Sequence, residues 1–321
     1  MPDPSSVDSE LEVVVAFATY RRPELVRTLL PLVVDQASGL HCRARVVVVD
    51  NDPHGSARAV VEEAALDGVE YHCEPTPGIA AARNRALDEA GTADVLVFLD
   101  DDEEPEPHWL GTLVEAWTAW RCTAVSGPVV SHFDGPVDPW VSACSTFRRP
   151  RRDSGALLEG AATNNLLLDL GQLRQLGLRF DDRFGLTGGS DTMLTRDLIR
   201  RGGQIRWCDE AVMHETVPAE RATRDWALRR TRRTGNVWAR VQLALAGSPS
   251  SRLRTRASLT ARGCYRLLAG TLAAIAGRFT RDLGRRSQGE LEVAKGLGVL
   301  GGAWGHQVTE YRRVAKSAAR A

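Results

Sequence analysis

The sequence predicts an α/β fold: a doubly wound, mostly parallel, Rossmann-like sheet followed by a helical C-terminal region. Over the first 130 residues, short segments that are apolar throughout alternate with amphipathic segments of helical periodicity. Strands that are apolar on both faces are typical of a parallel sheet covered by helices on both sides. From residue 220 onward the chain is rich in Arg, Ala and Leu at helical spacing.

Four strands and four helices are expected to alternate in the first part of the chain. The strands are LEVVVAFA (11–18), ARVVVVD (44–50), VEYHCE (69–74) and DVLVFLD (94–100). The helices are RPELVRTLLPLV (22–33), GSARAVVEEAALD (55–67), PGIAAARNRALDEAG (77–91) and EPHWLGTLVEAWTAW (106–120). In such sheets, ligands bind beyond the carboxyl ends of the strands.

The middle of the chain has a less regular pattern. We expect a strand with a Gly-Pro interruption at 124–133, a long loop at 134–156, and a strand with a short helix at 160–177. A glycine-rich loop leading into a helix is expected at 185–203, and a strand that ends at His214 is expected within 204–215. Amphipathic or apolar helical segments follow at 226–247, 264–279 and 296–305.

These patterns predict two domains. The first is a catalytic domain at 1–219, with a nucleotide-binding half at about 12–104 and an acceptor half at about 105–219. The second is a basic, mostly helical region at 220–321.

The net charge of zero hides a strong asymmetry. Residues 221–286 contain 16 Arg and only two acidic residues, whereas residues 1–220 are acidic overall. Different partners are therefore expected for the two parts. The six cysteines form no C-x-x-C pair, which indicates reduced thiols and disfavours a zinc site. No apolar run is long enough to span a bilayer, and the polar N-terminus is unlike a secretory signal.

Five consecutive acidic residues, Asp100 to Glu104, end the fourth predicted strand. In an extended segment, residues i and i+2 face the same side, so Asp100 and Asp102 can converge on one cation while Asp101 faces away. Paired carboxylates suit Mg²⁺ or Mn²⁺. The alternative is a solvated acidic turn, and Glu103, Glu104 and Glu106 are interpreted as a polar lead-in to the next helix.

The other strand ends are polar too, at Thr19-Tyr20-Arg21 and Asp50-Asn51-Asp52. The first turn, ATYRRPE, has no G-x-G-x-x-G, so NAD binding is not expected, and the chain has no P-loop.

Six segments together resemble the inverting glycosyltransferases of family 2, which have the GT-A fold. The resemblance covers roughly residues 12 to 240. It is carried by VVVAFATYRRPELVRTLLPLV, VVVVDNDPHG, PGIAAARNRALDEA, LVFLDDDEEPEPHWL, GAATNNLLLDLGQLRQLGLRFDDRFG and GGSDTMLTRDLIRRG. Their order and spacing are more specific than any single motif.

The resemblance implies a role for each of these motifs. Residues that would contact the nucleotide-sugar are Thr19, Arg21, Asp50, Asn51, Asp52, Arg83, Asp100 and Asp101. The metal would be held by Asp100 and Asp102, and a histidine at the position of His214 is a further ligand in some relatives; His214 could equally be structural.

Asp191 would be the general base, as inverting transfer needs a carboxylate near the acceptor hydroxyl. The family has Glu or Asp immediately before this acid, whereas here it is Ser190. Asp181 and Asp182 are rival acids, and Asn84 could be structural. The arginines at 229, 230, 232 and 233 could include a diphosphate clamp.

We therefore expect a metal-dependent inverting glycosyltransferase with a divalent cation, a nucleotide-sugar donor and a glycan or lipid-linked acceptor. It would act in cell-surface polysaccharide or glycoconjugate synthesis. The alternatives are a sugar-phosphate nucleotidylyltransferase, whose glycine-rich first loop is missing, and a non-catalytic scaffold acting through its basic helices.

The predicted location is cytoplasmic, with possible peripheral binding to an anionic membrane through the basic helices. Packing of these helices on the catalytic domain is the alternative. Nucleic acid is not an expected partner because no DNA- or RNA-binding module is recognisable.

Overall fold

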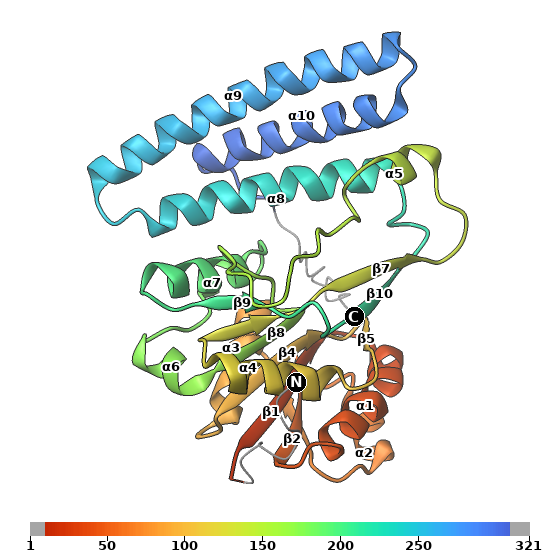
Figure 1. Cartoon of the computed structure of the whole chain (residues 1–321), viewed down its shortest axis with the longest axis vertical. Coiled ribbons are helices and arrows are strands. Elements are labelled where there is room, and N and C mark those ends of the chain that lie inside the picture. Colours follow the sequence, from red (N-terminus) through yellow and green to blue (C-terminus); the bar gives the residue numbers. More distant parts are fainter. Residues whose placement is uncertain (1–9, 309–321) are drawn as a thin grey trace, which may run out of the picture.

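The computed structural model describes residues 10–308. A seven-stranded sheet forms its centre, and a layer of three long helices lies beyond one end of it (Figure 1). The sheet has the order β3-β2-β1-β4-β8-β6-β9. Its strands are β1 (Glu12–Thr19), β2 (Arg43–Asp50), β3 (Val69–Cys73), β4 (Val95–Asp100), β6 (Ala124–Ser126), β8 (Asn165–Asp169) and β9 (Ile205–Trp207).

All of these strands run parallel except β8, which is antiparallel to both β4 and β6. The mostly parallel sheet predicted from the sequence is thus confirmed. The helices associated with it are α1 (Pro23–Ser38), α2 (Arg58–Ala64), α3 (Ile79–Ala90), α4 (Trp109–Trp120), α6 (Leu170–Gln175) and α7 (Ser190–Arg200).

Alternating side chains of each central strand enter two different cores. In β1, Val13, Val15 and Phe17 join the core that contains α1 and α4 side chains. Val14 and Ala16 point the other way and pack with side chains of α3 and α7. Because both faces are covered, the strand has to be apolar at every position, which is the pattern that the sequence shows.

A second sheet has three short strands, in the order β5-β10-β7. These are β5 (Glu103–Pro105), β7 (Val129–Phe133) and β10 (Met213–Val217). The single strand expected at 204–215 is therefore wrong: β9 and β10 belong to different sheets. The chain between them turns so that the carbonyl oxygen of Ala211 accepts a 2.7 Å hydrogen bond from Asn165.

Two other expectations for this region have mixed outcomes. The Gly-Pro interruption at 124–133 is confirmed, since it separates β6 from β7. The loop expected at 134–156 contains a short helix, α5 (Pro139–Ala143), which Asp138 caps through a hydrogen bond from the Trp140 nitrogen. A 3-10 turn, η2 (Asp182–Phe184), precedes α7.

The C-terminal region is helical, as predicted. It forms α8 (Arg224–Leu245), α9 (Pro249–Phe279) and α10 (Leu283–Ala303). In Figure 1, α8 lies nearest the central sheet and α9 lies farthest from it. A β-carbon added at Gly298 of α10 would lie 1.9 Å from the carbonyl oxygen of Arg232, so α8 and α10 touch through their backbones.

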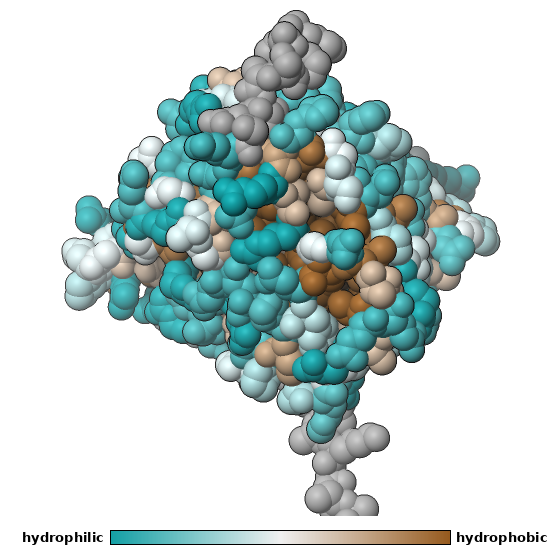
Figure 2. Space-filling model, turned by 90° about the horizontal axis from the view of Figure 1, so that it is seen from below, coloured by the Kyte–Doolittle hydropathy of each residue, from teal (hydrophilic) through white to brown (hydrophobic). Residues whose placement is uncertain are grey.

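Within residues 10–308, no helix is both long enough and apolar enough to cross a membrane. Figure 2 shows the end of the molecule opposite the three-helix layer. Hydrophilic residues cover most of this end, and hydrophobic residues show in its middle.

Candidate active site

The carboxyl ends of three neighbouring strands bring the predicted site residues to one edge of the sheet. Thr19 at the end of β1 pairs in register with Asp50 at the end of β2. On its other side, β1 pairs Ala18 with Asp100 at the end of β4. Segments separated by some 30 to 80 residues in the sequence therefore meet at the edge where parallel sheets bind ligands.

Asp101 is buried and holds the turn after β4 in place. Its two carboxylate oxygens accept hydrogen bonds from Thr19 Oγ1 at 2.8 Å and from Arg22 at 2.9 Å. Burial raises the pKa of Asp101, and the charge of Arg22 opposes that rise. The side chain of Asp101 thus faces away from solvent, as expected if it alternates in direction with Asp100 and Asp102. Its hydrogen bonds fix the backbone that presents these two carboxylates.

Asp100 and Asp102 are the open carboxylates of this turn, with 44% and 31% of their side chains exposed. Removal from bulk water is the main factor that raises the pKa of Asp100 to about 6; Arg83 opposes the rise, and the charges of Asp102, Asp101 and Asp191 add to it. This repulsion is the unfavourable interaction that a bound cation would relieve.

Three arginines surround the two open carboxylates. Arg83 lies 3.6 Å from Asp100. Arg22 and Arg221 lie 3.5 Å and 3.4 Å from Asp102. These distances exceed those of strong charge-assisted hydrogen bonds, which are about 2.7–2.9 Å. Arg22 and Arg221 are absent from the residues selected by sequence, and Arg221 arrives from the segment just before α8.

Arg83 also connects this turn to α7. Its guanidinium donates a 3.1 Å hydrogen bond to the hydroxyl of Ser190 and stacks over the ring of Phe180. Ser190 is fully buried beneath it. The serine that replaces the family's usual acid is therefore the residue that anchors Arg83.

Asp191 follows Ser190 in the first turn of α7 and is partly exposed. Its carboxylate accepts a 2.6 Å hydrogen bond from the backbone nitrogen of Thr192. The rival acid Asp181 instead accepts hydrogen bonds from the backbone and the guanidinium of Arg183, whose charge lowers the pKa of Asp181. Asp182 interacts with Asn84 at 3.5 Å.

Asn84 has a structural position. Its side-chain amide both donates to the Phe180 carbonyl at 2.9 Å and accepts from the Phe180 nitrogen at 3.0 Å. This pair of hydrogen bonds joins α3 to the segment before η2.

The turn after β2 is buried and internally bonded. Asp50 accepts hydrogen bonds from the nitrogen of Ala57 at 2.7 Å and the hydroxyl of Tyr71 at 3.0 Å. Asn51 donates to the carbonyls of Glu74 and Thr76 and accepts from the Gly78 nitrogen.

Asp52 completes this turn and forms a 3.1 Å ion pair with Arg21, whose backbone has a φ of 56°. Arg21 lowers the pKa of Asp52 against the opposing effect of burial. The five predicted nucleotide residues of the turns after β1 and β2 thus lie together, and their contacts to a nucleotide stay predictions.

Glu103 differs from its interpretation as part of a solvated lead-in. It is buried in β5, where Asn164 donates to it at 2.6 Å and the Asp100 nitrogen donates at 3.3 Å. Burial raises its pKa well above the usual range, with a further contribution from Asp100. The interpretation of Glu103 as part of a polar lead-in is therefore wrong. Its strand, β5, has only three residues and forms by pairing with the distant β10, so it leaves no periodic pattern in the local sequence.

His214 lies on β10, where neighbouring residues point to opposite faces. Its two ring nitrogens lie 2.7 Å from Glu106 and 2.7 Å from His132. The next residue, Glu215, is the one that pairs with Glu103 across the small sheet. The metal-ligand role of His214 stays a prediction.

The family of the chain is decided by comparison with known proteins. The sequence is 37% identical over 268 residues to the succinoglycan biosynthesis protein ExoM of Rhizobium meliloti (strain 1021), which covers 78% of this chain and 85% of that protein. The family described as Glycosyl transferase family 2 matches residues 14–168. The chain belongs to glycosyltransferase family 2.

Solved structures of glycosyltransferases share its fold. The mannosyltransferase PcManGT from Pyrobaculum calidifontis, in complex with GDP-Man and Mn²⁺, has a TM-score of 0.61 at 19% identity and covers 95% of this chain and 89% of that one. S. aureus TarS 1-349 in complex with UDP-GlcNAc has a TM-score of 0.51 at 13% identity and covers 87% of this chain and 90% of that one. The predicted GT-A fold is confirmed.

Family membership decides among the three expected functions. The chain is a glycosyltransferase, so the nucleotidylyltransferase and the non-catalytic scaffold are not retained. In this family 2 chain, the turn after β4 and the start of α7 are joined through Arg83, by contacts with Asp100 and Ser190.

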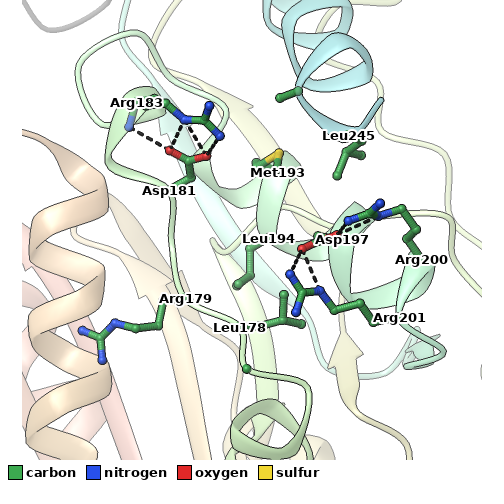
Figure 3. Close-up of a pocket in the computed structure, with 12 residues that line it drawn as sticks. Leu178, Arg179, Asp181, Arg183, Met193, Leu194, Asp197, Arg200, Arg201 and Leu245 are labelled. Atoms are coloured by element: carbon green, nitrogen blue, oxygen red, sulfur yellow. Dashed lines mark hydrogen bonds and ion pairs between the residues drawn. The ribbon is translucent and has the colours of Figure 1, made fainter. Parts of the chain in front are cut away.

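A separate pocket of about 290 Å³ lies beside α7 of this glycosyltransferase (Figure 3). Its arginines are already paired: Arg200 and Arg201 with Asp197, Arg183 with Asp181, and Arg179 with Asp88. Of its lining residues, only Asp181 is among the acids considered from the sequence, as a rival to Asp191. None of the residues predicted to contact the nucleotide-sugar or the metal lines this pocket.

Among the described residues, the group of three side chains close enough to share one metal ion is Glu70, His72 and Glu89. Arg45 binds Glu70 at 3.1 Å, and Arg85 binds both Glu89 and His72. Since arginines already compensate these carboxylates, the group forms an ion-pair network at the edge strand β3.

Proposed function

We propose that this family 2 enzyme transfers a sugar, with inversion, from a nucleotide-sugar bound at the carboxyl edge of the sheet to an acceptor hydroxyl. One observation carries the proposal. Arg83 contacts both Asp100 and Ser190, so the open carboxylates after β4 and the acid Asp191 belong to one continuous site.

Asp100 and Asp102 fit the coordination of a divalent cation. Both offer oxygen ligands, which Mg²⁺ and Mn²⁺ prefer, and both are partly open to solvent. Their arginine contacts are long enough for the carboxylates to turn towards an ion. A bound cation would supply positive charge against the diphosphate of the donor. The PcManGT structure, which contains Mn²⁺ and GDP-Man, supports this choice.

The chain's own residues perform the remaining steps. Asp191 would accept the proton of the acceptor hydroxyl while its oxygen forms a bond to the anomeric carbon of the sugar. The bond from that carbon to the diphosphate oxygen breaks at the same time, and the nucleoside diphosphate leaves with the electron pair. Arg83 and Arg221 lie where they could balance the charge that develops on this leaving group.

The buried turns after β1 and β2 would hold the nucleoside. Thr19, Arg21, Asp50, Asn51 and Asp52 form this part of the edge. Their internal hydrogen bonds favour a preorganised wall over a set of free side chains. We retain the proposed division into a catalytic domain at 1–219 and a helical region at 220–321, which Arg221 would connect to the active site.

The acceptor and the membrane association are proposed more broadly. The similarity to a succinoglycan biosynthesis protein supports a role in polysaccharide or glycoconjugate synthesis, with a glycan or lipid-linked acceptor. We propose that the enzyme works on the cytoplasmic side of an anionic membrane, to which it binds peripherally.

The test is a binding and hydrolysis screen with UDP-, GDP- and dTDP-sugars. Each donor is measured with Mn²⁺, with Mg²⁺ and with EDTA. At least one donor should bind in a metal-dependent way and be hydrolysed slowly. If no nucleotide-sugar binds under any of these conditions, the proposal is wrong. A donor that binds equally in EDTA would remove the metal from the mechanism and leave the transfer reaction in place.

A further inference from the structure

The outer face of α9 carries a stripe of exposed apolar side chains. The stripe consists of Tyr265, Leu268, Leu272, Ile275 and Phe279. These residues follow one another at intervals of three and four, so they lie on one side of the helix. Their exposed fractions run from 47% for Ile275 to 83% for Phe279. A helix that belongs only to a protein interior would have these residues covered.

The packing of α9 explains why the stripe is uncovered. The opposite side of the helix carries Gly263, Gly270 and Gly277, which are buried at intervals of seven residues. A β-carbon at Gly270 would lie 2.8 Å from the carbonyl oxygen of Gly289 in α10. Thus the buried glycines of α9 face α10, and the exposed apolar side chains lie on the opposite side of the helix. In Figure 1, α9 is the outermost of the three helices, farthest from the central sheet.

The charges on α9 are all of one sign. Pro249–Phe279 contains six arginines and no acidic residue. Arg254, Arg262 and Arg278 are exposed; beyond the helix end, Arg281 and Arg285 are exposed together with Asp282. The apolar stripe is therefore accompanied by positive charge along its length.

We propose that this stripe docks α9 onto the surface of an anionic phospholipid bilayer, with the helix lying parallel to the membrane. Apolar side chains would enter the boundary between headgroups and acyl chains, and the arginines would contact lipid phosphates. The inference names the surface behind the membrane association proposed above, and it is independent of the transfer chemistry.

A second copy of the chain is a less suitable occupant. Pairing two α9 stripes would bring the exposed Arg254, Arg262 and Arg278 of both helices together, without an acidic residue from either α9 to balance them. Like charges so placed destabilise a contact, whereas an anionic bilayer complements them. This charge pattern is the reason for choosing the membrane.

The proposed orientation places α10 and α8 between the bilayer and the active site (Figure 1). Packed helices are about 8–10 Å apart between axes. To reach Asp191, an acceptor hydroxyl would therefore have to lie at a distance of roughly two such spacings from the lipid headgroups.

The experiment is co-sedimentation of the full chain with vesicles. One set contains phosphatidylcholine and phosphatidylglycerol, and the other contains phosphatidylcholine alone. The test variant is Leu268→Gln with Leu272→Gln. A matched pair compares Leu272→Gln with Leu157→Gln, since these leucines are similarly exposed, at 59% and 61%, and Leu157 lies outside α9. Circular dichroism and thermal melting verify that each variant is folded.

We expect the intact chain to sediment with the anionic vesicles and much less with the neutral ones. The double variant should partition about tenfold more weakly or worse, because two leucine side chains lose their transfer from water. Leu157→Gln should bind like the intact chain.

Three results would overturn the inference: no sedimentation of the intact chain with anionic vesicles, unchanged binding of the folded double variant, or a dimer in analytical ultracentrifugation that the double variant dissociates. Donor binding is measured on the same preparations. Donor binding that persists without vesicle binding would overturn this inference and the proposed membrane association, and it would leave the transfer reaction in place. Loss of donor binding with intact vesicle binding would overturn only the proposed transfer reaction.

Discussion

A carboxylate oxygen of Glu103 lies 3.3 Å from the backbone nitrogen of Asp100, three residues earlier in the chain. The buried glutamate thus closes the turn that presents the open carboxylates. Asn164 holds the other oxygen at 2.6 Å, and Arg149, which pairs with Glu215, contributes a nearby positive charge.

We expect Glu103 to make the metal-free protein less stable as the pH rises. Its folded pKa is raised well above 4.5, so the folded state keeps a proton that the unfolded state releases above pH 4.5. The free energy of unfolding then falls with increasing pH above that value. Glu103→Gln removes this dependence. In EDTA, the melting temperature of the variant minus that of the wild type should therefore increase as the pH rises from 4.5 to 7. Parallel curves for the two proteins would contradict the assignment.

Variants of Thr19 can distinguish a structural role of its hydroxyl from a role in nucleotide binding. Its hydroxyl donates to the buried Asp101 at 2.8 Å, so Thr19→Val should cost about 1–3 kcal/mol of stability. Thr19→Ser keeps the hydroxyl and should restore most of that loss. Chemical denaturation measures both variants, and donor titration follows binding. A Val variant of full stability that binds donor poorly would assign the hydroxyl to the nucleotide instead.

The centre of the main sheet was predictable from the sequence because β1 and β4 are buried on both faces. Val13 to Phe17 are all apolar, and the short length of this run and its content of valine favour a buried strand over a helix. The small sheet was not predictable in the same way. Glu103 pairs with Glu215, more than a hundred residues away, and no local periodicity encodes such a contact.

Some residues of the candidate site could be predicted from the sequence, and others could not. Asp100 and Asp102 were identifiable because they end a strand that the pattern fixes. Arg22 and Arg221 were not, since their approach to Asp102 depends on how the chain leaves β1 and enters α8. The role of Ser190 became clear only once the fold had placed Arg83 against it.

Arg221 should contribute to donor binding. Its guanidinium lies 3.4 Å from Asp102, beside the proposed diphosphate position. Arg221→Gln should weaken nucleotide-sugar binding by roughly ten- to a hundredfold, as expected for the loss of one charge-assisted contact of about 1.5–3 kcal/mol. Arg43→Gln is the control, because this arginine is exposed at the start of β2, at the opposite end of the strand from the carboxyl edge. Calorimetric titration of both variants measures the effect, and equal affinities would argue against contact between Arg221 and the diphosphate.

Asp102 should control the affinity for the cation. Asp102→Asn keeps the size of the side chain and removes its charge, so Mn²⁺ should bind at least tenfold more weakly, as is typical when a charged oxygen ligand is lost. Manganese electron paramagnetic resonance reports this binding without any turnover. Glu104→Gln, at an exposed position of the same acidic run, is the matched control. If both variants bind Mn²⁺ like the wild type, the ion is held elsewhere.

Asp191 should affect turnover far more than donor binding. Asp191→Asn retains the shape of the side chain and removes its ability to accept a proton, so transfer to a genuine acceptor should fall by about 10²–10⁴-fold. The donor affinity should stay within about twofold of the wild-type value, because the carboxylate is proposed to act on the acceptor hydroxyl. The variant should therefore have a lower kcat and a nearly unchanged KM for the donor. Asp182→Asn is the matched control, since its carboxylate lies near Asn84 and outside the proposed reaction path. Transfer rates at saturating donor measure the difference, and a folded Asp191→Asn enzyme that transfers at the wild-type rate would exclude Asp191 as the base.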